Sequence, residues 1–289
     1  MKRFFTLAAL CIAFFSLRAA CAEVFFDHPP RDNWYQSPLL RITAFSHGAS
    51  DCMLLECGGE VMMVDGGTAA YGESLISEME KRGIRHFKYL FNTHYHEDHV
   101  GGLNELMAAG FTTDAYLHPY VYASIYANPN HRRAMSLVKS KDIFARQVQH
   151  GEVLYLGEAA LNVLRHDGST TANGRSTVLH VQFGTADALL TADVIGEAQT
   201  WFVENVDADL LQADLLKSPH HGVSAMTADF MKTVSPEMLF ITGPEKDAKE
   251  AIRQAEKNGV PFVSTEKGHI VMETDGTDWY VYQTESAFS

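Results

Sequence analysis

Three histidines and two acidic residues lie within six positions, in the segment Thr93-His94-Tyr95-His96-Glu97-Asp98-His99. Alternate residues His94 and His96 can point the same way and bind one cation through imidazole nitrogens. Asp98 and His99 turn the other way and can hold a second. Imidazole together with carboxylate suits Zn²⁺, with Mn²⁺ or iron as alternatives. The spacing therefore predicts a metal centre, with two zinc ions as the expected cofactor.

Other polar residues follow apolar runs further along the chain. Asp65 ends Val61 to Val64, where it could orient a ligand histidine or serve as a turn residue before glycine. Asp193 follows Ala188 to Ala192, where it could bridge two cations or cap a loop. The pair His220-His221, two residues after Lys217-Ser218, could add a further ligand. Local pattern alone leaves these roles open.

Elements must bring these separate segments together. Apolar, alternating runs predict strands at 39–45, 52–56, 61–64, 87–91, 176–183, 188–192, 238–241, 261–264, 268–273 and 279–283. Amphipathic patterns predict helices at 71–82, 103–109 and 245–258, with a helical pattern from 121 to 149. The order shows no strict strand–helix alternation. We therefore expect an α/β fold of two mixed sheets with helices outside, in one domain spanning 23–289.

Taken together, the motifs resemble the metallo-β-lactamase superfamily, and within it the extracytoplasmic hydrolase domain of ComEC-type DNA-uptake proteins. The motifs that carry the resemblance are Val64-Asp65-Gly66-Gly67, Thr93 to Gly102, Leu190-Thr191-Ala192-Asp193 and Lys217-Ser218-Pro219-His220-His221-Gly222. The resemblance implies a four-layer αββα sandwich. It also implies metal positions at His94, His96, Asp98, His99 and Asp193, with Asp65 behind them. Of the histidine pair, we expect His220 to bind metal and His221 to face the substrate.

One motif of the superfamily is missing. Many members supply a histidine between the first cluster and the bridging acid, in a Gly-His-Thr-like motif that this chain lacks. His166 lies in the corresponding region and could be the missing ligand or an ordinary loop histidine. We include His166 among the candidate ligands, and the number of bound ions stays open.

The expected reaction is hydrolysis. A water held between two cations loses a proton near neutral pH and can attack phosphorus or a carbonyl carbon. We expect Asp98 to hold and deprotonate this water, while His221 and Lys217 stabilise charge on the substrate. The resemblance implies a phosphodiester, and the alternatives are a phosphorylcholine ester or a lactone or lactam. A non-catalytic metal-binding module is an alternative of another class, for which a ligand should be missing.

The first residues and the net charge of the chain limit where it acts and which partners it can have. Lys2 and Arg3, a short apolar run and Ala20-Cys21-Ala22 predict a signal peptide at 1–22, cleaved after Ala22, with lipid attachment at Cys21 as the alternative. The mature protein would then be secreted and have no membrane span. Cleavage leaves 20 of the 23 basic residues against 36 acidic ones, a net charge of −16. An acidic surface favours a small or zwitterionic substrate over a stable nucleic-acid partner.

Overall fold

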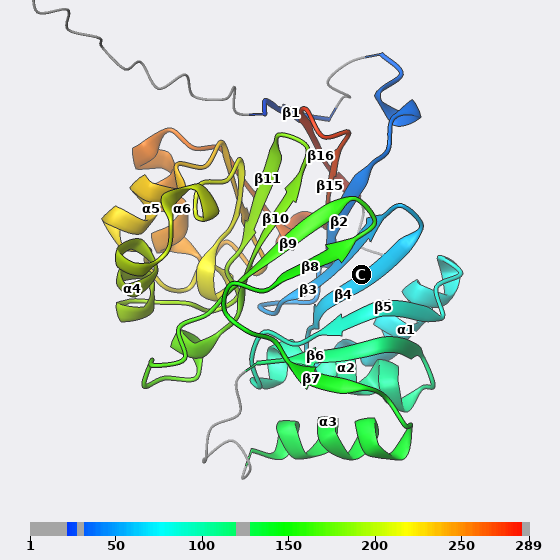
Figure 1. The fold of residues 1–289 in the computed structure, drawn as a ribbon. Helices are drawn as coiled ribbons and strands as arrows, with labels where there is room; N and C mark the ends of the chain where they lie inside the picture. Colours follow the sequence, from blue (N-terminus) through cyan, green and yellow to red (C-terminus); the bar gives the residue numbers. More distant parts are fainter. Residues whose placement is uncertain (1–21, 28–31, 120–127, 285–289) are drawn as a thin grey trace, which may run out of the picture.

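Two β-sheets face each other in the computed structural model, which describes residues 22–27, 32–119 and 128–284 (Figure 1). The larger sheet has the order β1-β16-β15-β2-β3-β4-β5-β6-β7. Its strands are β1 (Val24–Phe26), β16 (Trp279–Thr284), β15 (His269–Thr274), β2 (Leu40–Ala44), β3 (Cys52–Cys57), β4 (Glu60–Gly66), β5 (His86–Phe91), β6 (Thr112–His118) and β7 (Ala145–Gln147).

The smaller sheet has the order β14-β13-β12-β11-β10-β9-β8. Its strands are β14 (Phe262–Ser264), β13 (Met238–Ile241), β12 (Leu215–Lys217), β11 (Ala186–Leu190), β10 (Val178–Phe183), β9 (Ala159–Leu164) and β8 (Val153–Leu156). Strands β11 to β14 are parallel, so their carboxyl ends lie at one edge of this sheet.

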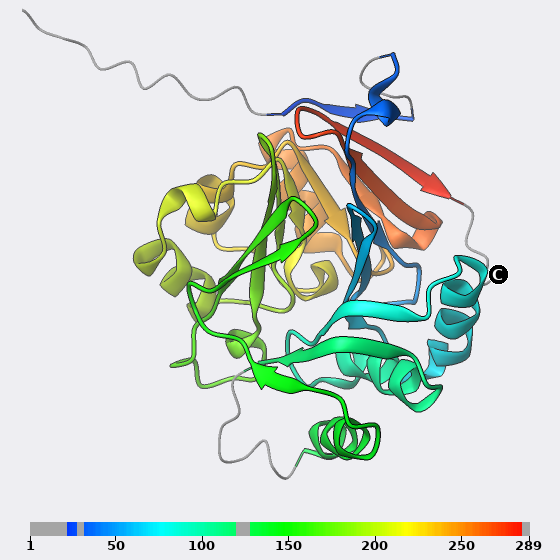
Figure 2. The same ribbon diagram turned by 45° about the vertical axis from the view of Figure 1, so that its right-hand side comes forward.

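Among the described residues, six α-helices cover the outer faces of the two sheets. Helices α1 (Gly72–Lys81), α2 (Glu97–Ala108) and α3 (Pro129–Ser140) lie on the side of the larger sheet. Helices α4 (Glu197–Asn205), α5 (Ala228–Val234) and α6 (Lys249–Asn258) lie on the side of the smaller one. Figures 1 and 2 show the two helical groups on opposite sides of the paired sheets. The predicted fold class, an αββα sandwich of two mixed sheets, is confirmed.

Alternation along the strands explains the layers. In β3, Met53 and Leu55 enter the core between the sheets, while Cys52 and Leu54 enter the core beneath α1 and α2. Each strand residue thus contacts the opposite layer from its neighbour, as a pleated strand buried on both faces requires. Cys52 and Cys57 lie on β3, and both are buried and free of a disulfide.

The structure differs from the sequence-based expectations in several places. Helix α2 begins at Glu97, inside the histidine motif, rather than at Leu103. The helical pattern predicted from 121 to 149 divides into α3 and the edge strand β7, and residues 120–127 lie outside the described ranges. Strand β1 was not predicted; it pairs in parallel with β16, a contact about 250 residues away that local pattern does not encode.

Residues 1–21 of the predicted signal peptide lie outside the described ranges. Within those ranges, no helix has both the length and the apolar character needed to span a bilayer.

Candidate metal centre

The histidine motif follows β5 and leads directly into α2. His96 is the residue before the first turn, and Asp98 and His99 lie within that turn. The positive end of the helix dipole favours a carboxylate at this place. Gly102 allows the close approach of α2 to the end of β4, because a Cβ atom there would lie 1.9 Å from the carbonyl oxygen of Gly66.

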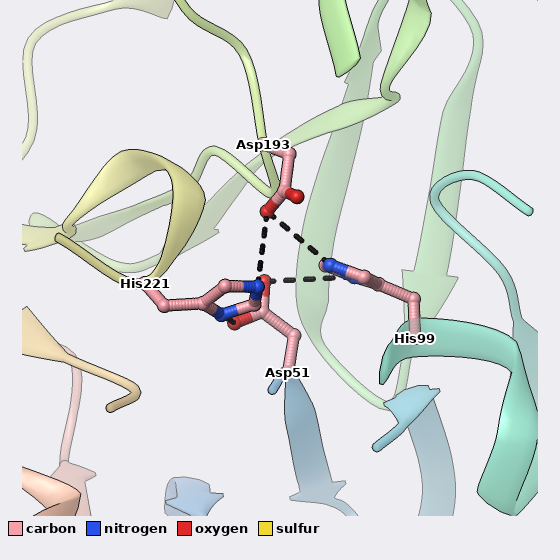
Figure 3. A group of neighbouring side chains, drawn as sticks. All are labelled: Asp51, His99, Asp193 and His221. Atoms are coloured by element: carbon pink, nitrogen blue, oxygen red, sulfur yellow. Dashed lines mark hydrogen bonds and ion pairs between the residues drawn. The ribbon is translucent and has the colours of Figure 1, made fainter. Parts of the chain in front are cut away.

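Four buried side chains from different segments converge beside this turn. They are Asp51, His99, Asp193 and His221, and one candidate ligand atom of each lies within 4.8 Å of the others (Figure 3). His99 Nε2 lies 3.2 Å from Asp193 Oδ1, and His221 Nε2 lies 3.5 Å from the same oxygen. His221 Nε2 is also 3.2 Å from Asp98 Oδ2.

A second group shares Asp193 with the first. It consists of His94, His96 and Asp193, again with ligand atoms within 4.8 Å of one another. His94 Nε2 lies 3.6 Å from Asp193 Oδ2 and 3.0 Å from His96 Nδ1. The two oxygens of Asp193 therefore face different groups, the geometry expected of a carboxylate that bridges two cations.

The buried polar atoms at this centre fit a metal. Both oxygens of Asp193, His99 Nε2 and His221 Nε2 are buried without a properly oriented hydrogen-bond partner among the described residues. Polar atoms left in this way are costly and rare in a folded protein. Nitrogen and carboxylate oxygen are suitable zinc ligands, so a divalent cation would satisfy all four atoms at once.

Asp65 lies behind His99. Its carboxylate accepts hydrogen bonds from the Thr93 backbone N–H at 2.8 Å and the Thr93 hydroxyl at 2.5 Å. Asp65 Oδ2 lies 2.7 Å from His99 Nδ1. A proton on Nδ1 leaves the Nε2 lone pair free to point at the centre, which is how carboxylates commonly orient metal-binding histidines.

The charges of the centre shift its pKa values. Burial disfavours the charged form of His99, but Asp193 and Asp65 outweigh this and raise its pKa well above the usual value. Burial also opposes the charge on Asp98, but His221 and His99 lower the pKa of Asp98 to about 2. Burial and the nearby His99 hold the pKa of His94 well below the usual value. In the absence of metal, the centre thus favours the ionised form of Asp98 and the protonated form of His99, while His94 stays neutral.

The structure places His221, rather than His220, in the buried four-residue group. The side chain of His221 is 3% exposed and lies within the four-residue group, whereas that of His220 is 30% exposed. The cause is local backbone geometry, because both residues have left-handed conformations, with φ of 50° and 55°. His220 Nδ1 lies 2.8 Å from Ser224 Oγ, and its Nε2 lies 3.9 Å from Asp193 Oδ2, on the side of His94.

Two other predicted residues also lie elsewhere than expected. The ring of His166 stacks on Trp201 at a centroid distance of 4.3 Å, and its Nε2 lies 3.4 Å from Glu197. The structure thus places His166 outside both candidate ligand groups. Lys217 is fully buried, so neither a surface position nor the predicted direct contact with substrate fits. Its Nζ lies 2.6 Å from Asp51 Oδ2 instead.

Asp51 was not assigned a role from the sequence. It lies just before β3, which is antiparallel to β4. Asp51 therefore lies at the same edge of the sheet as Asp65, near the end of β4. Burial would raise its pKa, but Lys217 and His221 hold the pKa of Asp51 well below the usual value. The available signal was its place directly before a strand that leads back to Asp65.

Comparisons with known proteins agree with the observed fold. YhfI from Bacillus subtilis, a metallo-beta-lactamase fold protein, is 15% identical with a TM-score of 0.56, over 82% of this chain and 99% of that chain. CmlA, a diiron beta-hydroxylase from Streptomyces venezuelae, is 13% identical with a TM-score of 0.50, over 78% of this chain and 52% of that chain. At these identities, the similarity concerns the fold alone.

A comparison with curated protein sequences gave no significant match. The family model of the metallo-beta-lactamase superfamily matches residues 46–243, which include every candidate ligand described above. The chain belongs to the metallo-β-lactamase superfamily.

Proposed function

We propose that the protein is a secreted, metal-dependent hydrolase that cleaves phosphodiester bonds at a site for two zinc ions. The observation that carries the proposal is the pair of side-chain groups that share Asp193 and leave its two oxygens, His99 Nε2 and His221 Nε2 unsatisfied. Support for secretion comes from the signal-like segment 1–22, and support for a phosphodiester comes from the resemblance to ComEC-type hydrolase domains.

The two ligand groups define two metal positions. His94, His96 and Asp193 would form the first position, and His99, Asp193 and His221 the second. Asp98, rather than the fourth group member Asp51, would complete the second position, because Asp98 Oδ2 lies 3.2 Å from His221 Nε2. His220 is the candidate to complete the first position, because its Nε2 approaches the same Asp193 oxygen as His94. When bound, two divalent cations would acidify a coordinated water and polarise the phosphoryl oxygens.

Asp98 is the candidate proton acceptor of the reaction. Its side chain is 32% exposed, more than the other carboxylates of the centre. The low pKa of Asp98 keeps the carboxylate ionised at neutral pH, so Oδ2 can accept a proton from an attacking water. The half-exposed ring of His220 lies on the accessible side, where it could instead contact the phosphoryl group.

The test is hydrolysis of bis-p-nitrophenyl phosphate by the purified protein, with metal content measured in parallel. We expect turnover that a chelator abolishes and that Zn²⁺ or Mn²⁺ restores. Asp98→Asn should lower kcat/KM by about 10² or more. His86→Ala is the matched control, because that histidine is exposed and pairs with Asp114, outside both ligand groups.

The counter-substrates are a phosphorylcholine ester, a lactone and a β-lactam. Hydrolysis of a lactone or lactam in the absence of phosphodiester turnover would contradict the proposed substrate class but not metal-dependent hydrolysis. Bound metal with no turnover of any of these substrates would favour a non-catalytic metal-binding protein.

A further inference from the structure

We propose that Asp51 and Lys217 form a buried ion pair that positions the ligands of the second metal position without binding the metal. The inference rests on the proposed metal centre but not on the identity of the substrate. Both side chains are completely buried, and Asp51 Oδ2 lies 2.6 Å from Lys217 Nζ.

The contacts of Asp51 distinguish it from a metal ligand. Its Oδ1 accepts a hydrogen bond from the Thr242 hydroxyl at 2.6 Å and lies 3.1 Å from His221 Nδ1. Its Oδ2 is occupied by the lysine ammonium group. Asp51 Oδ2 and both oxygens of Asp193 lack an oriented hydrogen-bond partner among the described residues. The two carboxylates differ in their distance from the lysine, because Lys217 Nζ lies 2.6 Å from Asp51 Oδ2 but 3.9 Å from Asp193 Oδ1, so the lysine charge is paired with Asp51.

Asp51 also connects the two segments that supply Asp98 and His221. Its backbone N–H donates to the carbonyl oxygen of Asp98 at 3.2 Å, while its carboxylate contacts the inner nitrogen of His221. The outer nitrogen, His221 Nε2, then lies 3.2 Å from Asp98 Oδ2. One residue therefore fixes the separation of two candidate ligands, one in helix α2 and the other in the turn after β12.

Lys217 extends the connection to the loop that carries Asp193. Its Nζ donates to the carbonyl oxygen of Ala192 at 2.8 Å and lies 3.9 Å from Asp193 Oδ1. Ala192 has a left-handed backbone with φ of 48°, a strained conformation for a residue with a Cβ. The lysine thus holds the turn that directs Asp193 into the centre.

A buried ion pair is a poor device for stability alone. Removing two charges from water costs more than packing two apolar side chains of similar volume, so such pairs are often replaceable without loss of stability. The Asp51–Lys217 pair contacts the three segments that carry Asp98, Asp193 and His221. Holding these candidate ligands in place explains a buried ion pair at this position.

The test uses the full chain with Asp51→Asn combined with Lys217→Met. This double variant removes one charge of each sign, so the net charge beside the metals is unchanged. We expect its metal-free form to keep the native near-ultraviolet circular dichroism. We expect one of two Zn²⁺ equivalents to bind about 10- to 100-fold more weakly in competition with a chromophoric chelator. The absorption spectrum of the Co²⁺ form should change for that equivalent only.

The matched control is Arg41→Met with Glu273→Gln, a pair between β2 and β15 that contacts none of the predicted ligands. It should leave both affinities and the Co²⁺ spectrum unchanged. Should the first double variant not fold, Thr242→Val removes the hydroxyl that contacts both Asp51 Oδ1 and His221 Nδ1, and it should weaken the same equivalent to a smaller degree.

Unchanged Zn²⁺ affinities and an unchanged Co²⁺ spectrum in the folded Asp51/Lys217 double variant would overturn the inference. The inference would also be overturned if the double variant no longer bound the second Zn²⁺ equivalent at all and its Co²⁺ spectrum showed the loss of an oxygen ligand. Asp51 would then be a metal ligand. If the unaltered protein binds no metal, this inference and the proposed function both fail. If it binds two ions but cleaves no phosphodiester, only the proposed function fails.

Discussion

Replacement of Gly102 by alanine tests how closely the metal-bearing helix must approach the sheet. A Cβ atom at this position would lie 1.9 Å from Gly66 O and 2.7 Å from Gly66 C. Real Cβ atoms essentially never come within 3.0 Å of such neighbours, so α2 and the end of β4 must separate by at least about 1.1 Å. Both obstructing atoms belong to backbone, which cannot rotate away as a side chain could.

The expected cost has two parts. Alanine gains about 0.5–1 kcal/mol of helix propensity over glycine, while overpacking costs about 1–3 kcal/mol, so the net loss of stability is about 0.5–2 kcal/mol. The larger effect should be on function, because Asp98 and His99 move with the helix. A displacement of about 1 Å in positioned groups can cost about 10²-fold in rate.

The assay is thermal unfolding of the metal-free protein, together with Zn²⁺ affinity and phosphodiester turnover. The control is Ala108→Gly, an alanine–glycine exchange at the exposed last residue of the same helix. If Gly102→Ala binds Zn²⁺ and melts as the unaltered protein does, the close approach of α2 to β4 is not required, and the reasoning is refuted.

Three further predictions follow from the same contacts. His221→Ala should weaken Zn²⁺ binding at one position far more than Val223→Ala, a change to a nearby side chain that is 47% exposed; equal effects in a chelator competition would contradict the inward placement of His221. Zn²⁺ binding should release protons and weaken as the pH falls, because His99 and His221 have raised pKa values and hold protons that the metal must displace. A Zn²⁺ affinity that does not depend on pH would contradict this. Burial and the nearby Asp214 raise the pKa of Asp187 from 3.8 to about 7, so its contribution to stability is full below pH 3.8 and is lost as the pH rises to about 7. Asp187→Asn should therefore flatten the decline of the unfolding free energy between these pH values. An unchanged decline in urea titrations would contradict the assignment.

The metal centre was largely predictable because its signal is local. Three histidines and an aspartate within six residues can serve few purposes other than metal binding, and the alternation of β3 and its neighbours predicts strands buried on both faces. Asp65 could be anticipated for the same reason, because it ends an apolar strand one step before glycine.

Other features depend on geometry that residue types do not encode. The inward placement of His221 results from two consecutive left-handed residues, a conformation that non-glycine residues rarely adopt. Lys217 was expected to stabilise charge on the substrate, yet it ends a central parallel strand that is buried on both faces. A lysine there requires a buried partner, and that partner, Asp51, is 166 positions away in the chain.

His166 illustrates the limit of transferring a motif by position. It lies in the region where relatives supply a histidine, but its ring is held against Trp201 and Glu197 rather than beside His94. The first metal position therefore has three ligand atoms in the described structure, with His220 as the candidate for the fourth.

The most direct test of the central claim is the metal content of the purified protein after reconstitution with Zn²⁺ and removal of excess metal. The account predicts about two ions per chain, with both lost when Asp193, the shared carboxylate, is replaced by alanine. A chain that retains no ion, or an Asp193→Ala variant that still binds two with unchanged affinity, would contradict it.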